Sequence, residues 1–214
     1  MKEIKLNRVV PEIFAQRGDL RSDIWQSEVV IERGKTYLIE AASGTGKSSL
    51  CSYLYGQRGD YQGVIMFDDS DVSTFSTNRW CEIRQQHISI LFQDLRLFGE
   101  LTALENVMIK NRMTNHRSLE QIESWFDELG IPDKLHSRID RMSYGQQQRV
   151  ALIRALCQPY DFILLDEPIS HLDDRNSDIM RDIILREASA SGAAVIATSI
   201  GKHMNISYDK ILRL

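Results

Sequence analysis

The residues from Ala41 to Ser48, Ala-Ala-Ser-Gly-Thr-Gly-Lys-Ser, have types and a spacing suited to holding a phosphate. They come close to the phosphate-binding pattern G-x-x-x-x-G-K-[ST]. Gly44 and Gly46 allow a tight turn that directs backbone N–H groups at phosphate oxygens. Lys47 supplies a cation for the outer phosphates, and the Ser48 hydroxyl is a ligand for Mg²⁺. Ala41 departs from the pattern, because a glycine usually stands there.

The segments on either side of this loop fit a phosphate site. The apolar run Tyr37–Glu40 predicts a strand before the loop, and Ser49–Leu54 predicts a helix after it. The N-terminus of a helix favours anions, so the loop and the helix would act together. The segment taken alone is also compatible with an ordinary turn rich in glycine and serine.

A second candidate site is the acidic pair Asp166 and Glu167, which follows the apolar run Phe162–Leu165. Carboxylates at the carboxyl end of a buried strand lie where α/β sheets bind ligands. Asp166 is suited to the shell of a Mg²⁺ ion, and Glu167 to polarising an attacking water as a general base. A strand that simply ends in polar residues is the alternative for this pair alone.

A third segment, Met142–Leu152, begins with Ser143 before residues that favour a helix. Serine is a good N-cap, and the helix N-terminus that it starts is a place for an anion. Considered alone, the segment is equally an ordinary capped helix.

Composition and charge exclude several classes of protein. The chain has 214 residues, 43% of them hydrophobic, and a net charge of −4, which argues against broad binding of nucleic acid. No secretory signal is recognised at the start, and no apolar run approaches the ~20 residues that cross a bilayer, so we expect a soluble chain. Cys51, Cys81 and Cys157 lack metal spacing and are interpreted as structural residues of a reducing cytosol.

Short apolar runs alternate with helical patterns, which predicts a mostly parallel sheet covered by helices. The predicted strands are Thr36–Ala41, Val64–Phe67, Ile88–Phe92, Phe162–Asp166, Ala194–Thr198 and Lys210–Leu214. Further helices are predicted at Asn78–Gln85, Leu119–Leu129, Gly145–Cys157 and Asp173–Ala190. The region from Asp94 to Met142 is mainly helical and is interpreted as an insertion between two strands.

The three segments together resemble the ATP-binding subunits of ABC (ATP-binding cassette) transporters, over nearly the whole chain and in the family's order. Ala41–Ser48 is similar to the Walker A loop, and Met142–Gln146 to the signature L-S-G-G-Q. Asp166 and Glu167 match the Walker B aspartate and the catalytic glutamate beside it. The segment Ser170–Asp173 resembles the family's D-loop.

The resemblance implies a set of ligand-binding residues. Gln93 matches the Q-loop glutamine that senses Mg²⁺, and Phe14 has the position of the aromatic residue that stacks on adenine. The remaining residues expected to contact ATP are Ala42, Ser43, Gly44, Thr45, Gly46, Lys47, Ser48, Ser49, Ser143, Gly145 and Gln146. The implied Mg²⁺ ligands are Ser48, Gln93 and Asp166, and the implied catalytic residues are Glu167, Lys47 and Ser199.

The resemblance also implies the fold: an α/β, RecA-like P-loop NTPase core with a mostly parallel sheet, an N-terminal antiparallel β portion and an inserted helical subdomain. The chain would be a single ABC ATPase domain. Residues 1–93 and 157–214 would form the nucleotide-binding core, and residues 94–156 the helical signature subdomain.

The implied mechanism needs two subunits packed head to tail, each capping the other's ATP with Ser143 and Gly145. ATP would favour the closed dimer, and hydrolysis would open it. The expected partner is an integral-membrane permease, with the chain cytoplasmic at the inner face of the cell membrane and no nucleic acid bound. The segments Leu91–Phe98 and Leu101–Val107 look like the branch that serves lipoprotein release, macrolide export and cell division.

Two further residues depart from the family. Tyr144 replaces a signature glycine, and we expect its ring to point away from the nucleotide. Ser199 stands where the family has the switch histidine, which contacts the γ-phosphate. A serine is shorter and carries no charge, so the loss is on the order of 2–4 kcal/mol of transition-state stabilisation. His203 lies four residues on and is expected to be exposed to solvent.

Four functions were compared. The first is the ATPase of a transporter, and the second is a subunit that binds ATP but hydrolyses it slowly, which Ser199 favours and Glu167 opposes. A soluble ABC protein of DNA repair or translation usually carries a long coiled-coil insertion or two fused cassettes, and neither is present. A P-loop kinase would not explain the segment Met142–Gln146.

Overall fold

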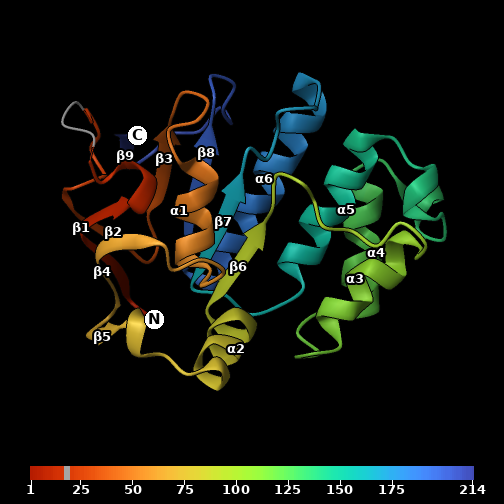
Figure 1. The fold of residues 1–214 in the computed structure, drawn as a ribbon. Helices are drawn as coiled ribbons and strands as arrows, with labels where there is room; N and C mark the ends of the chain where they lie inside the picture. Colours follow the sequence, from red (N-terminus) through yellow and green to blue (C-terminus); the bar gives the residue numbers. More distant parts are fainter. Residues whose placement is uncertain (17–19) are drawn as a thin grey trace.

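The protein is described here by a computed structural model that covers residues 1–16 and 20–214, and these residues form two sheets and six α-helices (Figure 1). The larger sheet is parallel, with the strand order β6-β7-β8-β3-β9. Its strands are β3 (Thr36–Glu40), β6 (Ile88–Leu91), β7 (Phe162–Asp166), β8 (Ala194–Ser199) and β9 (Lys210–Arg213).

The strands β6, β7 and β8 are buried along their whole length, which explains their nearly continuous apolar sequences. In the register of the sheet, Leu91 lies opposite Leu165, Asp166 opposite Thr198, and Glu40 opposite Ser199. The carboxyl ends of four strands therefore meet at one edge, as the sequence predicts for the ligand site.

The smaller sheet is antiparallel and has the order β2-β1-β4-β5. Its strands are β1 (Glu3–Pro11), β2 (Glu28–Glu32), β4 (Tyr61–Phe67) and β5 (Ser70–Asp71). The run Val64–Phe67, expected in the parallel sheet, is the end of β4 and pairs with β1 instead. Ile65 and Phe67 are buried while Val64 is exposed, a pattern typical of a sheet with one open face.

The α-helices agree with their predicted ranges to within two residues at either end, where a helix was predicted. They are α1 (Lys47–Leu54), α2 (Thr77–Gln86), α3 (Ala103–Asn111), α4 (Leu119–Glu128), α5 (Tyr144–Leu156) and α6 (Asp174–Ser191). Single 3₁₀ turns lie at Glu12–Phe14, Val72–Thr74, Pro132–Lys134 and Ile139–Arg141. Side-chain caps start all the α-helices except α1; the capping residues are Ser76, Thr102, Ser118, Ser143 and Asp173.

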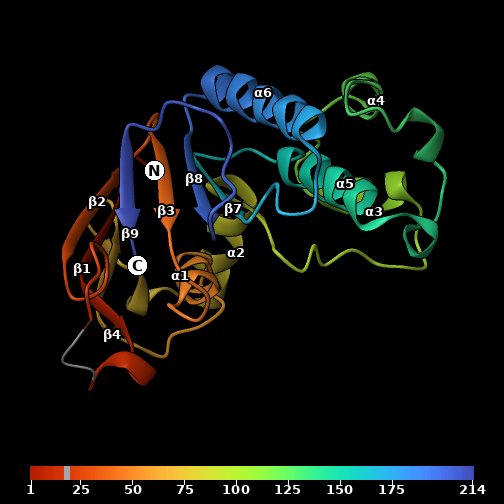
Figure 2. The ribbon, with the colours of Figure 1, turned by 90° about the horizontal axis from the view of Figure 1, so that it is seen from above.

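The helices cover both faces of the parallel sheet. Figure 2 shows α6 over one face of β7 and β8, with α1 and α2 on the other face. Helices α3, α4 and α5 lie together beyond the β6 edge in both views. The segment between residues 94 and 156 contains these three helices and no named strand, and its limits as a subdomain stay a prediction.

The buried apolar side chains form two clusters, one on each face of the parallel sheet. Strand β7 contributes to both, because its successive side chains point to opposite faces. Ile163 and Leu165 belong to the cluster that contains α3, α4, α5 and α6 residues. Phe162 and Leu164 belong to the cluster that contains α1 and the antiparallel sheet. The carboxyl edge of β7 is thus held rigidly from both sides.

Candidate functional site

The glycine loop joins β3 to α1 and has the backbone conformation that its sequence predicts. Gly44 and Gly46 have φ angles of 80° and 101°, in the left-handed region that favours glycine. A Cβ at Gly46 would also come within 3.0 Å of Trp25 and 3.2 Å of Phe14. Ala41 is not among the residues of positive φ, so its methyl group is accepted without strain.

Trp25 supports this loop, a role that the sequence analysis missed. Its indole Nε1 donates to the carbonyl of Thr45 at 2.9 Å, and the side chain is buried. The Thr45 hydroxyl in turn donates to the carbonyl of Ala42 at 2.9 Å. Ala42 and Thr45 thus shape the loop through hydrogen bonds, although neither lines the hollow beside it.

Lys47 and Glu167 face each other across the loop. The Lys47 Nζ lies 3.6 Å from a carboxylate oxygen of Glu167, and both side chains are largely buried. Glu167 has a φ of 52°, which turns it out of strand β7. The same oxygen, Oε1, accepts no hydrogen bond from the described residues, and Lys47 is its ion-pair partner. The predicted base therefore lies beside the predicted phosphate cation.

A hollow of about 290 Å³ brings together most of the residues predicted to bind the nucleotide. Phe14, its neighbour Ile13, Gln93 and Glu167 line this hollow together with the glycine loop and the start of α1. The loop and helix residues are Ser43, Gly44, Gly46, Lys47, Ser48 and Ser49. Phe14 is 5% exposed, whereas Ile13 is 70% exposed. The exposed apolar side chains of this hollow are therefore Ile13 and Ile200, neither of which the sequence analysis identified.

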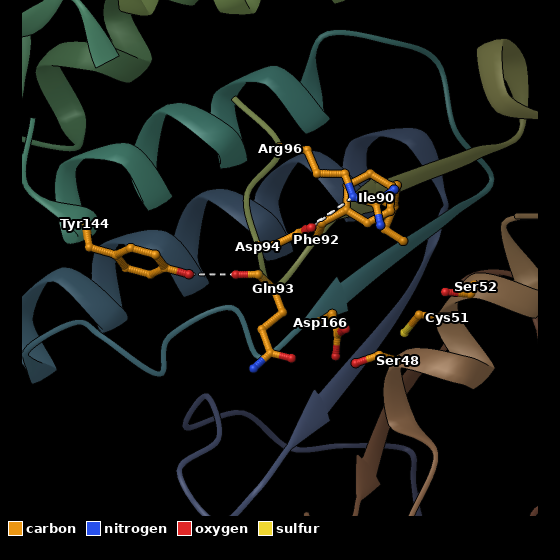
Figure 3. Close-up of a pocket in the computed structure, with 10 residues that line it drawn as sticks. All are labelled: Ser48, Cys51, Ser52, Ile90, Phe92, Gln93, Asp94, Arg96, Tyr144 and Asp166. Carbon is orange, nitrogen blue, oxygen red and sulfur yellow. Dashed lines mark hydrogen bonds and ion pairs between the residues drawn. The ribbon is translucent and has the colours of Figure 1, made fainter. Parts of the chain in front are cut away.

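A second hollow of about 430 Å³ adjoins the first and contains the predicted metal ligands (Figure 3). Ser48, Gln93 and Asp166 line it together, from α1, the loop after β6 and the end of β7. Figure 3 shows the Gln93 amide extending toward the side of the hollow where Ser48 and Asp166 lie. The two hollows share Ser48 and Gln93, so these two residues lie at the border between them.

These three side chains fit a Mg²⁺ ion. A hydroxyl, an amide oxygen and a carboxylate are hard oxygen donors, which Mg²⁺ prefers. Across residues 1–16 and 20–214, no group of three or more His, Cys, Asp and Glu side chains is placed to hold a metal. A cation at this site would therefore take further ligands from phosphate oxygens and water, as Mg²⁺ bound with a nucleotide does.

Thr198 organises the acidic pair and was also missed. Its hydroxyl donates to Asp166 Oδ1 at 2.6 Å and accepts from the backbone N–H of Glu167 at 3.2 Å. The register of β7 and β8 places Thr198 directly beside Asp166. The Thr198 hydroxyl therefore holds both the Asp166 carboxylate and the backbone N–H of Glu167 in place.

The signature residues lie apart from the glycine loop of the same chain. Ser143 caps α5: its hydroxyl accepts from the Gln146 N–H at 3.4 Å, and its own N–H donates to Gln146 Oε1 at 3.0 Å. Neither hollow is lined by Ser143, Gly145 or Gln146. Tyr144 does line the Mg²⁺ hollow, and its hydroxyl donates to the carbonyl of Gln93 at 2.6 Å.

The switch position offers no polar group to the nucleotide hollow. The Ser199 hydroxyl is buried and donates to the carbonyl of Lys202 at 2.8 Å. Its neighbour Ile200 lines the hollow instead. His203 is exposed, as predicted, and its ring packs against Tyr208 with centroids 6.1 Å apart.

Within the described ranges 1–16 and 20–214, no helix is both long enough and apolar enough to cross a bilayer.

Comparison with known proteins agrees with this geometry. The family described as "ABC transporter" matches residues 26–170. The macrolide export ATP-binding/permease protein MacB of a Shewanella species is 32% identical over 190 residues, which cover 86% of this chain and 28% of MacB. An uncharacterised ABC transporter ATP-binding protein of Mycobacterium tuberculosis is 29% identical over the whole of this chain and 65% of its own length. The chain thus spans less than two thirds of either relative.

Solved structures show the same fold. The dimeric ATP-binding cassette MJ0796 bound to ADP and Pi has a TM-score of 0.77 and 24% identity, covering 92% of this chain and 87% of that one. A bacterial Atm1-family ABC exporter with ATP bound has a TM-score of 0.80 and 21% identity, covering 100% of this chain and 37% of that one. The fold is therefore the P-loop NTPase fold of ABC cassettes, and the chain belongs to the ABC transporter family of ATP-binding proteins.

Proposed function

We propose that this chain binds and hydrolyses Mg-ATP to power a membrane permease of the export type. The observation that carries the proposal is the meeting of Lys47 and Glu167, 3.6 Å apart, over a hollow lined by the glycine loop. A cation for the phosphates and a carboxylate that can accept a proton, at one place, are what phosphoryl transfer to water requires.

Each residue has a defined part in this proposal. The backbone of Gly44–Lys47 binds the phosphates, and Lys47 neutralises charge on the outer ones. Glu167 accepts a proton from the attacking water at its carboxylate. Ser48, Gln93 and Asp166 would hold Mg²⁺, which neutralises charge on the phosphate oxygens when bound.

The signature residues are proposed to act in a head-to-tail homodimer. Ser143 is exposed and Gly145 is half-buried, and both lie at the start of α5, whose N-terminus favours an anion. Neither lines the nucleotide hollow of its own chain, so an ATP held by the partner subunit is their proposed ligand. Residues 94–156 would form the subdomain that carries them.

The permease and the direction of transport are proposed from the relatives. MacB is named as a macrolide export ATP-binding/permease protein, and the chain matches 28% of its length. We infer that a permease partner completes the transporter, with this chain on the cytoplasmic side of the cell membrane.

The test is steady-state hydrolysis of Mg-ATP by the wild type and by Glu167→Gln. Removing a general base is expected to lower kcat by about 10²–10⁴-fold, while binding of a fluorescent ATP analogue persists. Glu82→Gln is a matched control, because Glu82 is exposed and pairs with Arg79. Equal turnover by the wild type and Glu167→Gln would remove Glu167 from the mechanism.

A second candidate is an ATP-binding regulatory subunit with slow hydrolysis. The observation that favours it is the buried Ser199 hydroxyl, which bonds Lys202 rather than facing the nucleotide hollow. If the candidate is right, Ser199→His raises kcat, by up to about 10²–10³-fold if the new side chain reaches the γ-phosphate. Thermal unfolding must show that the variant is folded, and an unchanged kcat in a folded variant counts against this candidate.

A further inference from the structure

Helix α5 holds the loop that follows β6 at two places. Tyr144 lies in the first turn of α5, and its hydroxyl donates to the carbonyl of Gln93 at 2.6 Å. Arg154 lies in the last turn of α5, and its guanidinium donates to the carbonyls of Leu95 at 2.5 Å and Arg96 at 2.7 Å. Three backbone carbonyls within four residues of the loop are thus bound by one helix.

The loop held in this way is strained. Leu95 and Arg96 have φ angles of 57° and 48°, so two successive residues with side chains are in the left-handed region. Residues in this conformation are kept there only by the contacts around them, and they are concentrated at functional sites. The contacts from α5 are the surroundings that hold this loop.

Tyr144 is itself fixed at both ends. Its ring packs edge-on against His171, with centroids 4.5 Å apart and an angle of 72°. Strand β6 ends at Leu91, so the Gln93 carbonyl lies beyond the sheet and takes its hydrogen bond from Tyr144.

The Gln93 side chain depends on this backbone position. Figure 3 shows the Tyr144 hydroxyl bonded to the Gln93 carbonyl, while the Gln93 amide extends away from it toward the side where Ser48 and Asp166 lie. If the carbonyl were released, the left-handed residues after Gln93 would be free to relax and the amide would lose its fixed direction.

We propose that Tyr144 is a positioning residue for cation binding, because its hydroxyl fixes the Gln93 backbone so that the Gln93 amide faces Ser48 and Asp166. The proposal rests on the proposed function, since it assigns Gln93 to Mg²⁺ bound with ATP. It concerns the residue that departs from the family signature, Tyr144 in place of glycine.

The test measures the Mg²⁺ dependence of nucleotide binding, not hydrolysis. The fluorescence of mant-ATP is titrated at fixed protein while Mg²⁺ is varied, and again in EDTA. Tyr144→Phe keeps the ring and removes the hydroxyl. Its half-saturating Mg²⁺ concentration is expected to rise about 2–12-fold, as for the loss of one hydrogen bond, with affinity in EDTA unchanged.

Two comparisons separate positioning from a general structural role. Tyr53→Phe is the matched control, because the Tyr53 hydroxyl also donates to a backbone carbonyl, that of Asp60 at 3.0 Å. It should leave the Mg²⁺ dependence unchanged. In the background of Gln93→Ala, Tyr144→Phe should have no further effect, because both changes remove the same ligand.

The outcomes are distinct. An unchanged Mg²⁺ dependence in Tyr144→Phe, equal weakening with and without Mg²⁺, or additive effects with Gln93→Ala would each overturn the inference. If the wild type itself binds no mant-ATP, the proposed function fails instead. A Tyr144→Phe protein with a lowered melting temperature but a raised Mg²⁺ requirement only in the presence of Gln93 still supports the inference.

Discussion

The side-chain amide of Gln148 donates to the backbone carbonyl of Glu167 at 3.3 Å, and to that of Pro168 at 2.6 Å. Gln148 is 2% exposed and lies on α5, whereas Glu167 has a left-handed φ of 52°. The amide therefore fixes the unusual backbone that turns the Glu167 carboxylate toward Lys47. The same helix that carries the signature residues holds the candidate base.

Gln148→Met is expected to lower both stability and turnover. The Pro168 carbonyl loses its donor, which costs about 1–3 kcal/mol for an unsatisfied buried group, and the Glu167 carbonyl keeps only its hydrogen bonds from Ser170. The measurements are urea unfolding and steady-state ATP hydrolysis. Gln147→Met is the matched control, because the Gln147 amide also donates to two carbonyls, those of Ile139 and Met142, away from Glu167. Equal loss of turnover in both variants would contradict the assignment.

Trp25→Phe is expected to weaken ATP binding by about 2–12-fold, the value of one net hydrogen bond. The phenyl ring fills most of the space against Gly46 but cannot donate to the Thr45 carbonyl. The check is titration with mant-ATP, with Trp80→Phe as control. Trp80 packs against Phe67 and Phe75, away from the loop, so this change should leave the affinity unaltered.

Thr198→Val keeps the shape of the side chain and removes its hydroxyl. Asp166 Oδ1 then loses a donor and the Glu167 N–H loses an acceptor, which is expected to cost about 1–3 kcal/mol in the free energy of unfolding. Mg²⁺-dependent ATP binding should weaken because Asp166 is no longer fixed. Thr198→Ser retains the hydroxyl and should behave like the wild type; if it is impaired as much as Thr198→Val, lost packing rather than the hydrogen bond is responsible.

The Lys110 side chain is expected to make the free energy of unfolding depend on pH. Burial, with the nearby charges of Arg154 and Arg84, lowers the pKa of Lys110 to about 8. Its amine donates to the Arg84 carbonyl at 3.3 Å, and Arg96 and Arg154 line the same cavity. The unfolded chain has the ordinary value of ~10.4, so between pH 8 and 10 it binds more protons than the folded state. The buried Lys110 charge therefore lowers the free energy of unfolding by its full amount below pH 8, and this loss shrinks as the pH rises.

Lys110→Met should accordingly raise the melting temperature at pH 7, and the gain should shrink as the pH rises from 8 to 10. Thermal unfolding at several pH values measures this difference. Lys35→Met is the control, because the Lys35 side chain is half exposed. A gain that stays constant with pH would show that packing, not charge, makes the difference.

The sequence predicted the parts of the site that depend on local spacing. The loop Ala41–Ser48 and the pair Asp166–Glu167 are short segments, and their residue types alone indicate phosphate and metal binding. The structure brings the two segments together. Their supports were not predictable in this way. Trp25 reaches Thr45 across 20 residues, and Thr198 reaches Asp166 across 32, so these contacts depend on tertiary packing alone.

The fold was predicted with a similar limit. Buried strands such as Phe162–Asp166 are recognised from their continuous apolar residues. Val64–Phe67 was assigned to the wrong sheet, because a run of four residues does not reveal which strand it pairs with. Phe14 was chosen as the base-stacking residue from its position; it lines the hollow and is 5% exposed, and its contact with a base stays a prediction.

The apolar cluster on the α6 side of the parallel sheet has a consequence for how the protein unfolds. It joins Trp125 of α4 and Leu152 of α5 to Leu165 of β7, Ile183 of α6 and Val195 of β8. The cluster thus joins the helical region to the sheet through apolar side chains. Heating should therefore melt residues 94–156 together with the parallel sheet in one cooperative transition, and the helical region excised alone should not hold its structure.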